Sequence, residues 1–167
     1  MIDMGGQQCP HDISGPVSSL KSAQVNKPVF TTALEAEAAF YDALARSDLD
    51  AMMQVWSEDD EVVCIHPDGA RLVGLHAVRE SWRQLFASGV RLAVSVSQRV
   101  ASGNSLLATH NVIEHVALPG DERAPPPMVA TNAYASGPHG WKMIMHHASP
   151  APDSLPAGTH DGPRVVH

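Results

Sequence analysis

The sequence predicts an α+β domain in which three N-terminal helices pack in a strongly curved, mostly antiparallel sheet. Helical periodicities occupy the first half of the chain, and alternating apolar and polar residues occupy the second half. Helices and strands grouped in this way are typical of an α+β fold, whereas a parallel sheet needs them to alternate. Only one proline interrupts residues 29–118, while both ends of the chain are rich in proline. We therefore expect one domain over residues 31–149, between flexible segments at 1–30 and 150–167.

Two helices are expected at the start of the domain. Thr31 and Thr32 are suitable N-caps, and the residues that follow them form an apolar stripe at helical spacing: Leu34, Ala38, Tyr41 and Ala45. Ser47 and Asp48 end this helix and begin a second one, whose apolar face carries Leu49, Met52, Met53 and Trp56. A third helix is expected after Gly74, with an apolar face made by Val78, Trp82 and Leu85.

Strands are expected in the rest of the domain. Residues 61–66 are a short apolar run with β-branched residues, and a turn at 67–69 leads to a returning strand at 71–73. Over residues 90–100 the apolar side chains fall at even positions, which predicts a strand with one buried face. Three further strands are expected at 106–118, 128–136 and 141–148. A curved sheet wrapped over three helices leaves a pocket at its open end.

Composition excludes several classes of protein. The 167 residues hold 11 basic and 18 acidic side chains, for a net charge of −7, whereas a nucleic-acid-binding protein needs a basic face. No apolar run approaches the roughly 20 residues that span a membrane. The two cysteines, Cys9 and Cys64, indicate free thiols in a reducing compartment, and the first residues do not resemble a secretory signal. We therefore expect a cytoplasmic protein without nucleic-acid or membrane partners.

One family shares the order and spacing of several of these motifs. Residues 48–86 combine a helix that ends at Trp56, a strand that ends at Ile65-His66-Pro67, and a helix that contains Trp82. Two later segments agree with them, at residues 108–114 and 130–149. Over residues 31–149 the chain resembles the SnoaL-like branch of the nuclear transport factor 2-like superfamily. This resemblance implies a cone-shaped α+β barrel, a homodimer packed through the sheets, and a deep, largely apolar pocket.

The resemblance also implies a range of activities, because the superfamily includes ketosteroid isomerases, polyketide cyclases, dehydratases and epoxide hydrolases. In the isomerases an aspartate base lies where this chain has His66, and a pocket tyrosine lies where it has Phe40. A second, protonated aspartate aligns near Thr131 and Asn132. Since all three roles are changed, we do not expect steroid isomerisation by that mechanism.

Three residues are the candidate catalytic groups: His66, Glu114 and His147. His66 ends a strand where the cone opens, and an imidazole there can exchange a proton at neutral pH, unless it only bonds a turn carbonyl. Glu114 shares a strand face with His110, so it can orient an imidazole or act as a base with a raised pKa, unless its bond is only structural. His146 and His147 point to opposite faces of the last strand, so at most one of them reaches the pocket. The sequence pattern does not choose between them.

Candidate ligand-binding residues are the aromatic and polar side chains expected near the pocket: Trp56, Trp82, His110, Asn132, Tyr134 and His146. Tryptophan rings line many apolar pockets, although at helical spacing they also belong to cores. No cofactor and no metal is expected, since the H-x-x-x-H, H-E-x-x-H and C-x-x-C patterns do not occur. The geometric alternative is a three-histidine site from His66, His110 and one histidine of the last strand.

These observations predict a protein that binds a small apolar or amphipathic organic molecule in the pocket of the cone. Histidine-based acid/base chemistry of the isomerase, cyclase, dehydratase or hydrolase type is compatible with the candidate residues. The alternatives are a ligand-binding module without turnover and a dimeric adaptor.

Overall fold

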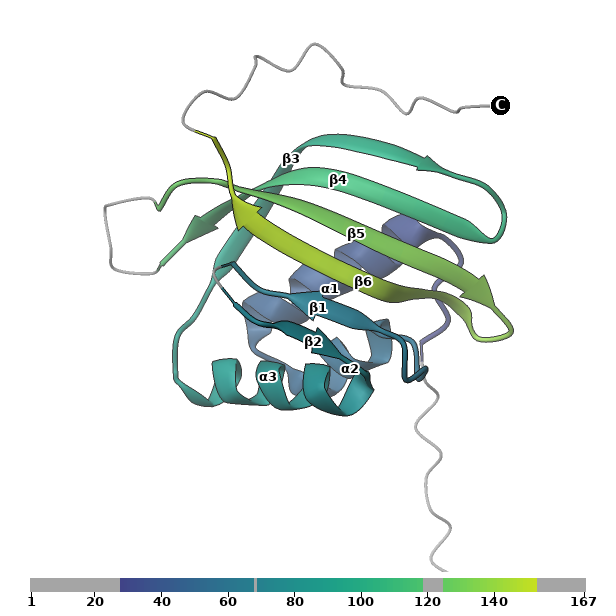
Figure 1. Cartoon of the computed structure of the whole chain (residues 1–167), viewed down its shortest axis with the longest axis horizontal. Coiled ribbons are helices and arrows are strands. Elements are labelled where there is room, and N and C mark those ends of the chain that lie inside the picture. Colours follow the sequence, from purple (N-terminus) through teal and green to yellow (C-terminus); the bar gives the residue numbers. More distant parts are fainter. Residues whose placement is uncertain (1–27, 68, 119–124, 153–167) are drawn as a thin grey trace, which may run out of the picture.

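The predicted α+β class and the predicted order of elements are confirmed (Figure 1). A computed structural model describes residues 28–67, 69–118 and 125–152, so most of the segments expected to be flexible lie outside the described residues. The helices are α1 (Ala33–Arg46), α2 (Leu49–Val55) and α3 (Leu75–Ala87). The strands are β1 (Val63–Ile65), β2 (Arg71–Val73), β3 (Ala93–Gly103), β4 (Leu107–Ala117), β5 (Met128–Gly137) and β6 (Gly140–Pro150).

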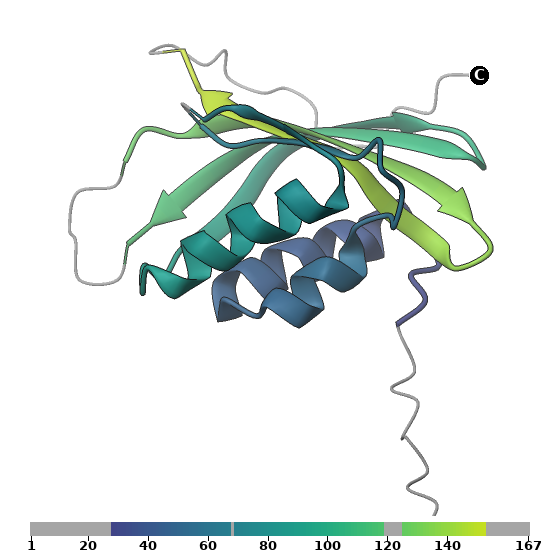
Figure 2. The same ribbon diagram turned by 60° about the horizontal axis from the view of Figure 1, so that its bottom comes forward.

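One six-stranded sheet, in the order β2-β1-β6-β5-β4-β3, forms the frame of the domain. Neighbouring strands are antiparallel except for the parallel pair β1 and β6. Figure 2 shows that all three helices lie on one face of this curved sheet. The described strands curve without closing, so the cone is an open sheet wrapped over helices and not a complete barrel.

Helix α1 begins and ends where expected, but its buried face differs from the predicted stripe. The Thr32 hydroxyl accepts a hydrogen bond from the Glu35 backbone N–H, which caps the helix. The predicted apolar stripe was wrong for three of its four residues, because Leu34 is 51% exposed and Ala38 and Ala45 are also exposed. The buried face instead carries Ala36, Glu37, Phe40, Tyr41, Ala43 and Leu44. Alanine is frequent on every side of this helix, so its apolar pattern does not define one phase.

The core lies between the helices and the concave face of the sheet. Its largest fully buried side chains include Phe40, Met52, Trp56, Tyr134 and Met143. Cys64 lies in the same core, and burial raises the pKa of its thiol to about 12, which makes it an unreactive side chain. Within the described ranges, no helix has the length and apolar character needed to cross a membrane.

A β-bulge in β3 changes which side chains face the helices. Between Ser97 and Val100 the register with β4 shifts, so Gln98 and Arg99 together oppose a single residue of β4. Gln98 adopts a positive φ of 49° at this point. The expected alternation therefore ends at the bulge: Val100 is 58% exposed, and Arg99 reaches towards α1.

Candidate functional site

A cavity of about 500 Å³ lies between α1, α3 and the concave face of the sheet. Its walls are mainly apolar and include Phe40, Leu44, Trp82, Leu85, Leu92 and Val116. Its polar lining residues are His66, Ser81, Gln84, Glu114 and His146. A volume of this size is typical of sites for small organic molecules.

Four side chains form a hydrogen-bonded chain whose two ends, Glu114 and His146, line the cavity. The Tyr41 hydroxyl donates to Glu114 Oε1 at 2.7 Å. Asn132 Nδ2 donates to the Tyr41 oxygen at 3.2 Å, and Asn132 Oδ1 lies 2.7 Å from His146 Nδ1. The fold brings these residues together because Asn132 of β5 is in register with His146 of β6, and Tyr41 reaches across from α1.

The direction of these bonds fixes the tautomer of His146. Tyr41 has a single proton, which goes to Glu114, so its oxygen accepts from the Asn132 amide. The amide oxygen of Asn132 then faces His146, and an oxygen can only accept. Nδ1 of His146 is therefore the protonated nitrogen. Nε2 carries a lone pair and makes no hydrogen bond with a described residue.

Burial shifts the proton affinities of the two ends of this chain in opposite directions. Removal from water raises the pKa of Glu114, and the negative charge of Glu37 raises it further, although the Tyr41 hydrogen bond opposes both effects. Removal from water lowers the pKa of His146 to about 3, and the neighbouring His66 and His147 add to that shift. Burial therefore disfavours the charged form of both groups, and His146 is a neutral imidazole at neutral pH.

His66 occupies another part of the cavity wall, directly after β1. Its Nε2 lies 2.8 Å from the Ser81 hydroxyl of α3, and its ring meets the edge of Trp82 with centroids 4.6 Å apart. Burial lowers the pKa of His66, so the ring is predominantly neutral at neutral pH. A turn follows, in which the Gly69 N–H donates to the His66 carbonyl. The His66–Ser81 pair thus offers the cavity a second group that can exchange a proton.

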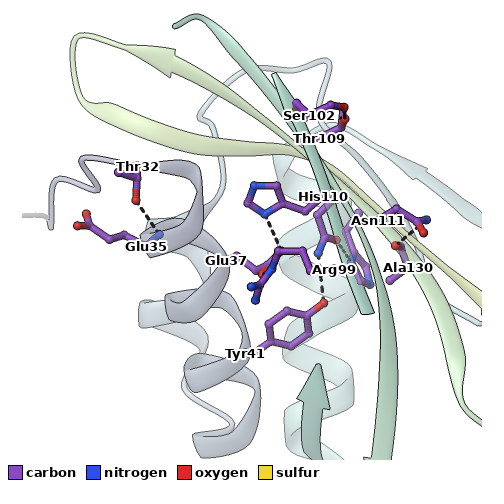
Figure 3. Close-up of polar contacts among 12 residues, drawn as sticks. Thr32, Glu35, Glu37, Tyr41, Arg99, Ser102, Thr109, His110, Asn111 and Ala130 are labelled. Carbon is purple, nitrogen blue, oxygen red and sulfur yellow. Dashed lines mark hydrogen bonds and ion pairs between the residues drawn. The ribbon is translucent and has the colours of Figure 1, made fainter. Parts of the chain in front are cut away.

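A separate ionic cluster lies on α1, one turn before Tyr41 (Figure 3). Its centre is Glu37, which is only 1% exposed. Arg99 Nε donates to Glu37 Oε1 at 2.6 Å, and His110 Nδ1 lies 2.7 Å from Glu37 Oε2. The bulge in β3 places Arg99, whose side chain is 39% exposed, at this position. The cluster binds α1 to β3 and β4, and its negative charge acts on Glu114.

The structure brings only some of the predicted site residues together. His66, Glu114, Trp82 and His146 line the cavity, and Asn132 bonds two residues of its wall chain. The expectation of a catalytic His147 requires correction, because alternation along β6 places His147 on the exposed outer face and His146 inside.

Three predicted ligand-binding residues do not line this cavity. Trp56 is 1% exposed in the core, and Tyr134 is fully buried there beside His110. His110 is held by Glu37, whose Oε2 lies 2.7 Å from its Nδ1. In the part of the chain that the structure describes, no three His, Cys, Asp or Glu side chains are grouped so that they could hold a metal ion.

Sequence reasoning missed Glu37, Arg99, Ser81 and the role of Tyr41. Glu37 and Arg99 each look like a solvated charge, because nothing local indicates the helix phase or the bulge that turns them inward. Ser81 directly precedes Trp82 on the expected buried face of the third helix. Its position beside Trp82 is the one signal in the sequence that could have indicated a role for Ser81.

The comparisons with known proteins agree with this fold. Residues 34–154 match the family described as SnoaL-like domain. The chain therefore belongs to the SnoaL-like domain family, within the nuclear transport factor 2-like superfamily. A comparison with functionally curated proteins found no match.

Two solved structures are similar to this chain in both sequence and fold, and a third is similar in fold alone. A Thiobacillus denitrificans protein named as a calcium/calmodulin-dependent protein kinase type II association domain is 38% identical, with a TM-score of 0.67 over 75% of this chain and 99% of that one. A Streptomyces avermitilis protein named as a dehydratase of the nuclear transport factor 2-like family is 28% identical, with a TM-score of 0.63 over 70% and 91%. A Pseudomonas putida protein of unknown function shares the fold at 17% identity, with a TM-score of 0.65 over 74% and 93%.

Proposed function

We propose that the protein binds a small apolar or amphipathic organic molecule in the cavity and catalyses a proton-transfer reaction on it. The observation that carries this proposal is the pairing of Glu114 and His146 on one cavity wall. Burial raises the proton affinity of the carboxyl group and lowers that of the imidazole. Burial thus shifts Glu114 towards the protonated form that a general acid needs and His146 towards the unprotonated form that a general base needs.

Dehydration is the reaction type that we favour among isomerisation, cyclisation, dehydration and hydrolysis. Nε2 of His146 takes a proton from a carbon of the substrate, and the electron pair of that C–H bond becomes a new C=C bond. The C–O bond on the neighbouring carbon breaks, and the leaving hydroxyl takes a proton from Glu114 Oε2 and departs as water. The Tyr41 hydroxyl, bonded to Glu114 Oε1, then stabilises the carboxylate that remains. The 28% identical protein named as a dehydratase supports this choice.

The direct test follows small molecules from the source cells by mass spectrometry during incubation with the protein. We expect consumption of a compound with the appearance of a product lighter by one water. His146→Gln should lower that rate by roughly 10²–10⁴-fold, the usual contribution of a general base. His147→Gln is the matched control, because it changes the adjacent histidine on the exposed face and should alter the rate far less than His146→Gln does.

Other results of that experiment would favour other functions. A compound that co-purifies with the protein but is never consumed would favour a ligand-binding module. Neither binding nor turnover would contradict the proposal and favour an adaptor, a function that the name of the 38% identical relative suggests. We also propose a homodimer, supported by two exposed apolar residues of the sheet, Val73 and Met145, which pair in register with the buried Val63 between them.

A further inference from the structure

The polar wall of the cavity on β6 offers an acceptor and no donor. His146 carries its single proton on Nδ1, where Asn132 Oδ1 lies 2.7 Å away. Nε2 is therefore unprotonated, and no described residue donates a hydrogen bond to it. A ligand that meets Nε2 favourably must bring its own donor, since an acceptor placed there would face a lone pair.

The described lining residues also carry no positive charge. They include one carboxyl group, Glu114, and two buried histidines, but neither lysine nor arginine. Arg99 and Arg83 are held by carboxylates, those of Glu37 and Glu80. A ligand carboxylate that entered the cavity would lose its water shell without gaining a cation.

We propose that the cavity selects uncharged ligands that bring a hydroxyl group to His146 Nε2, and that it rejects the carboxylate of the same carbon skeleton. Alcohols and phenols belong to the accepted class, whereas carboxylic acids and phosphate esters do not. This inference rests on the proposed function, because it takes the entry of a small organic molecule as given. It adds the chemical class of that molecule and the atom that selects it: Nε2 accepts the hydroxyl hydrogen bond on entry, and it takes the carbon proton only after that hydroxyl has turned to Glu114.

The test compares three bicyclic probes that differ in one group: 2-naphthol, 2-methoxynaphthalene and 2-naphthoate. Dissociation constants are measured by isothermal titration calorimetry near neutral pH. We expect 2-naphthol to bind about tenfold more tightly than 2-methoxynaphthalene, because one hydrogen bond is lost. We expect 2-naphthoate to bind at least about a hundredfold more weakly than 2-naphthol.

The three probes also separate failure of this inference from failure of the proposed function. Binding of 2-naphthoate as tight as that of 2-naphthol, or equal binding of 2-naphthol and its methyl ether, would overturn the selection while leaving the cavity as a binding site. If none of the three probes binds, the proposed function fails together with the selection.

Asn132→Asp should reverse the preference. A carboxylate beside Nδ1 favours the imidazolium form of His146, so Nε2 becomes a charged donor. We expect the ratio of 2-naphthoate to 2-naphthol affinity to rise at least about tenfold. Asn111→Asp adds the same charge on the outer face of β4, where Asn111 Nδ2 bonds the Ala130 carbonyl and the Thr131 hydroxyl, and should leave the ratio unchanged. An unchanged ratio in folded Asn132→Asp protein would overturn the role of Nε2.

Discussion

Lowering the pH from about 7 to about 4 is expected to cost the folded protein on the order of 3 kcal/mol through His146 alone. In the folded state burial lowers the pKa of this imidazole from its ordinary value of 6.5 to about 3. Between those values the unfolded chain binds a proton that the folded chain does not bind. The free energy of unfolding therefore falls as the pH falls through this window, and the contribution of His146 is fully present only above the unfolded pKa.

Urea unfolding of wild type and His146→Gln across this pH range measures the effect. The glutamine side chain does not titrate, so the free energy of unfolding of the variant should depend less steeply on pH. The difference in this free energy between wild type and variant should change by about 3 kcal/mol from about pH 7 to about pH 4. His147→Gln is again the matched control and should keep most of the wild-type slope, since His147 is exposed on the outer face of β6 and adds only a minor part of the His146 shift. Parallel curves for wild type and His146→Gln would contradict the buried, neutral imidazole.

Glu37→Ala is expected to lower the free energy of unfolding by about 3 kcal/mol, which corresponds to a fall in Tm of roughly 10 °C. The carboxylate of Glu37 holds both Arg99 Nε and His110 Nδ1, and its removal leaves His110 without that partner at 5% exposure. Removing one member of a buried polar cluster costs more than the cluster contributes, because the remaining groups are left without their partner. The partial exposure of Arg99 lets water reach its guanidinium, which keeps the loss at the lower end of the usual range.

Asp42→Ala is the control on the same helix. Asp42 pairs with Arg46 on the surface of α1, with both side chains more than half exposed, so its loss should cost less than about 0.5 kcal/mol. Thermal unfolding of the two variants decides the comparison. Similar, small losses for Glu37→Ala and Asp42→Ala would mean that the cluster does not hold α1 against the sheet.

The order of elements could be predicted from the sequence because each element has a local signal. The caps of α1 and α2, the turn after β1 and the alternation of β4 all act within a few residues. The helical phase of α1 had no comparable signal, since alanines on every side make several stripes equally apolar. Packing of Phe40 against Trp82, with ring centroids 5.6 Å apart, accompanies the observed phase, and that contact joins residues far apart in the chain.

The candidate site was predictable only where strand alternation determines it. Glu114 and His110 share a face, as expected, because β4 continues through both without a bulge. The pattern of β6 could not choose between His146 and His147, since residues on both of its faces are apolar. The choice depends on the pairing of β6 with β5, which places His146 beside Asn132. Arg99 depends in the same way on a bulge that the sequence does not mark.

The charge and tautomer of His146 test the central claim of this account most directly, because the proposed base and the proposed selectivity both depend on them. Nitrogen-15 NMR of histidine-labelled protein distinguishes a protonated from an unprotonated ring nitrogen, and His146→Gln assigns the signal. We predict a neutral ring with the proton on Nδ1 from about pH 8 down to about pH 5, well below the usual histidine pKa. A ring that carries its proton on Nε2, or that becomes charged near its ordinary pKa, would contradict the account.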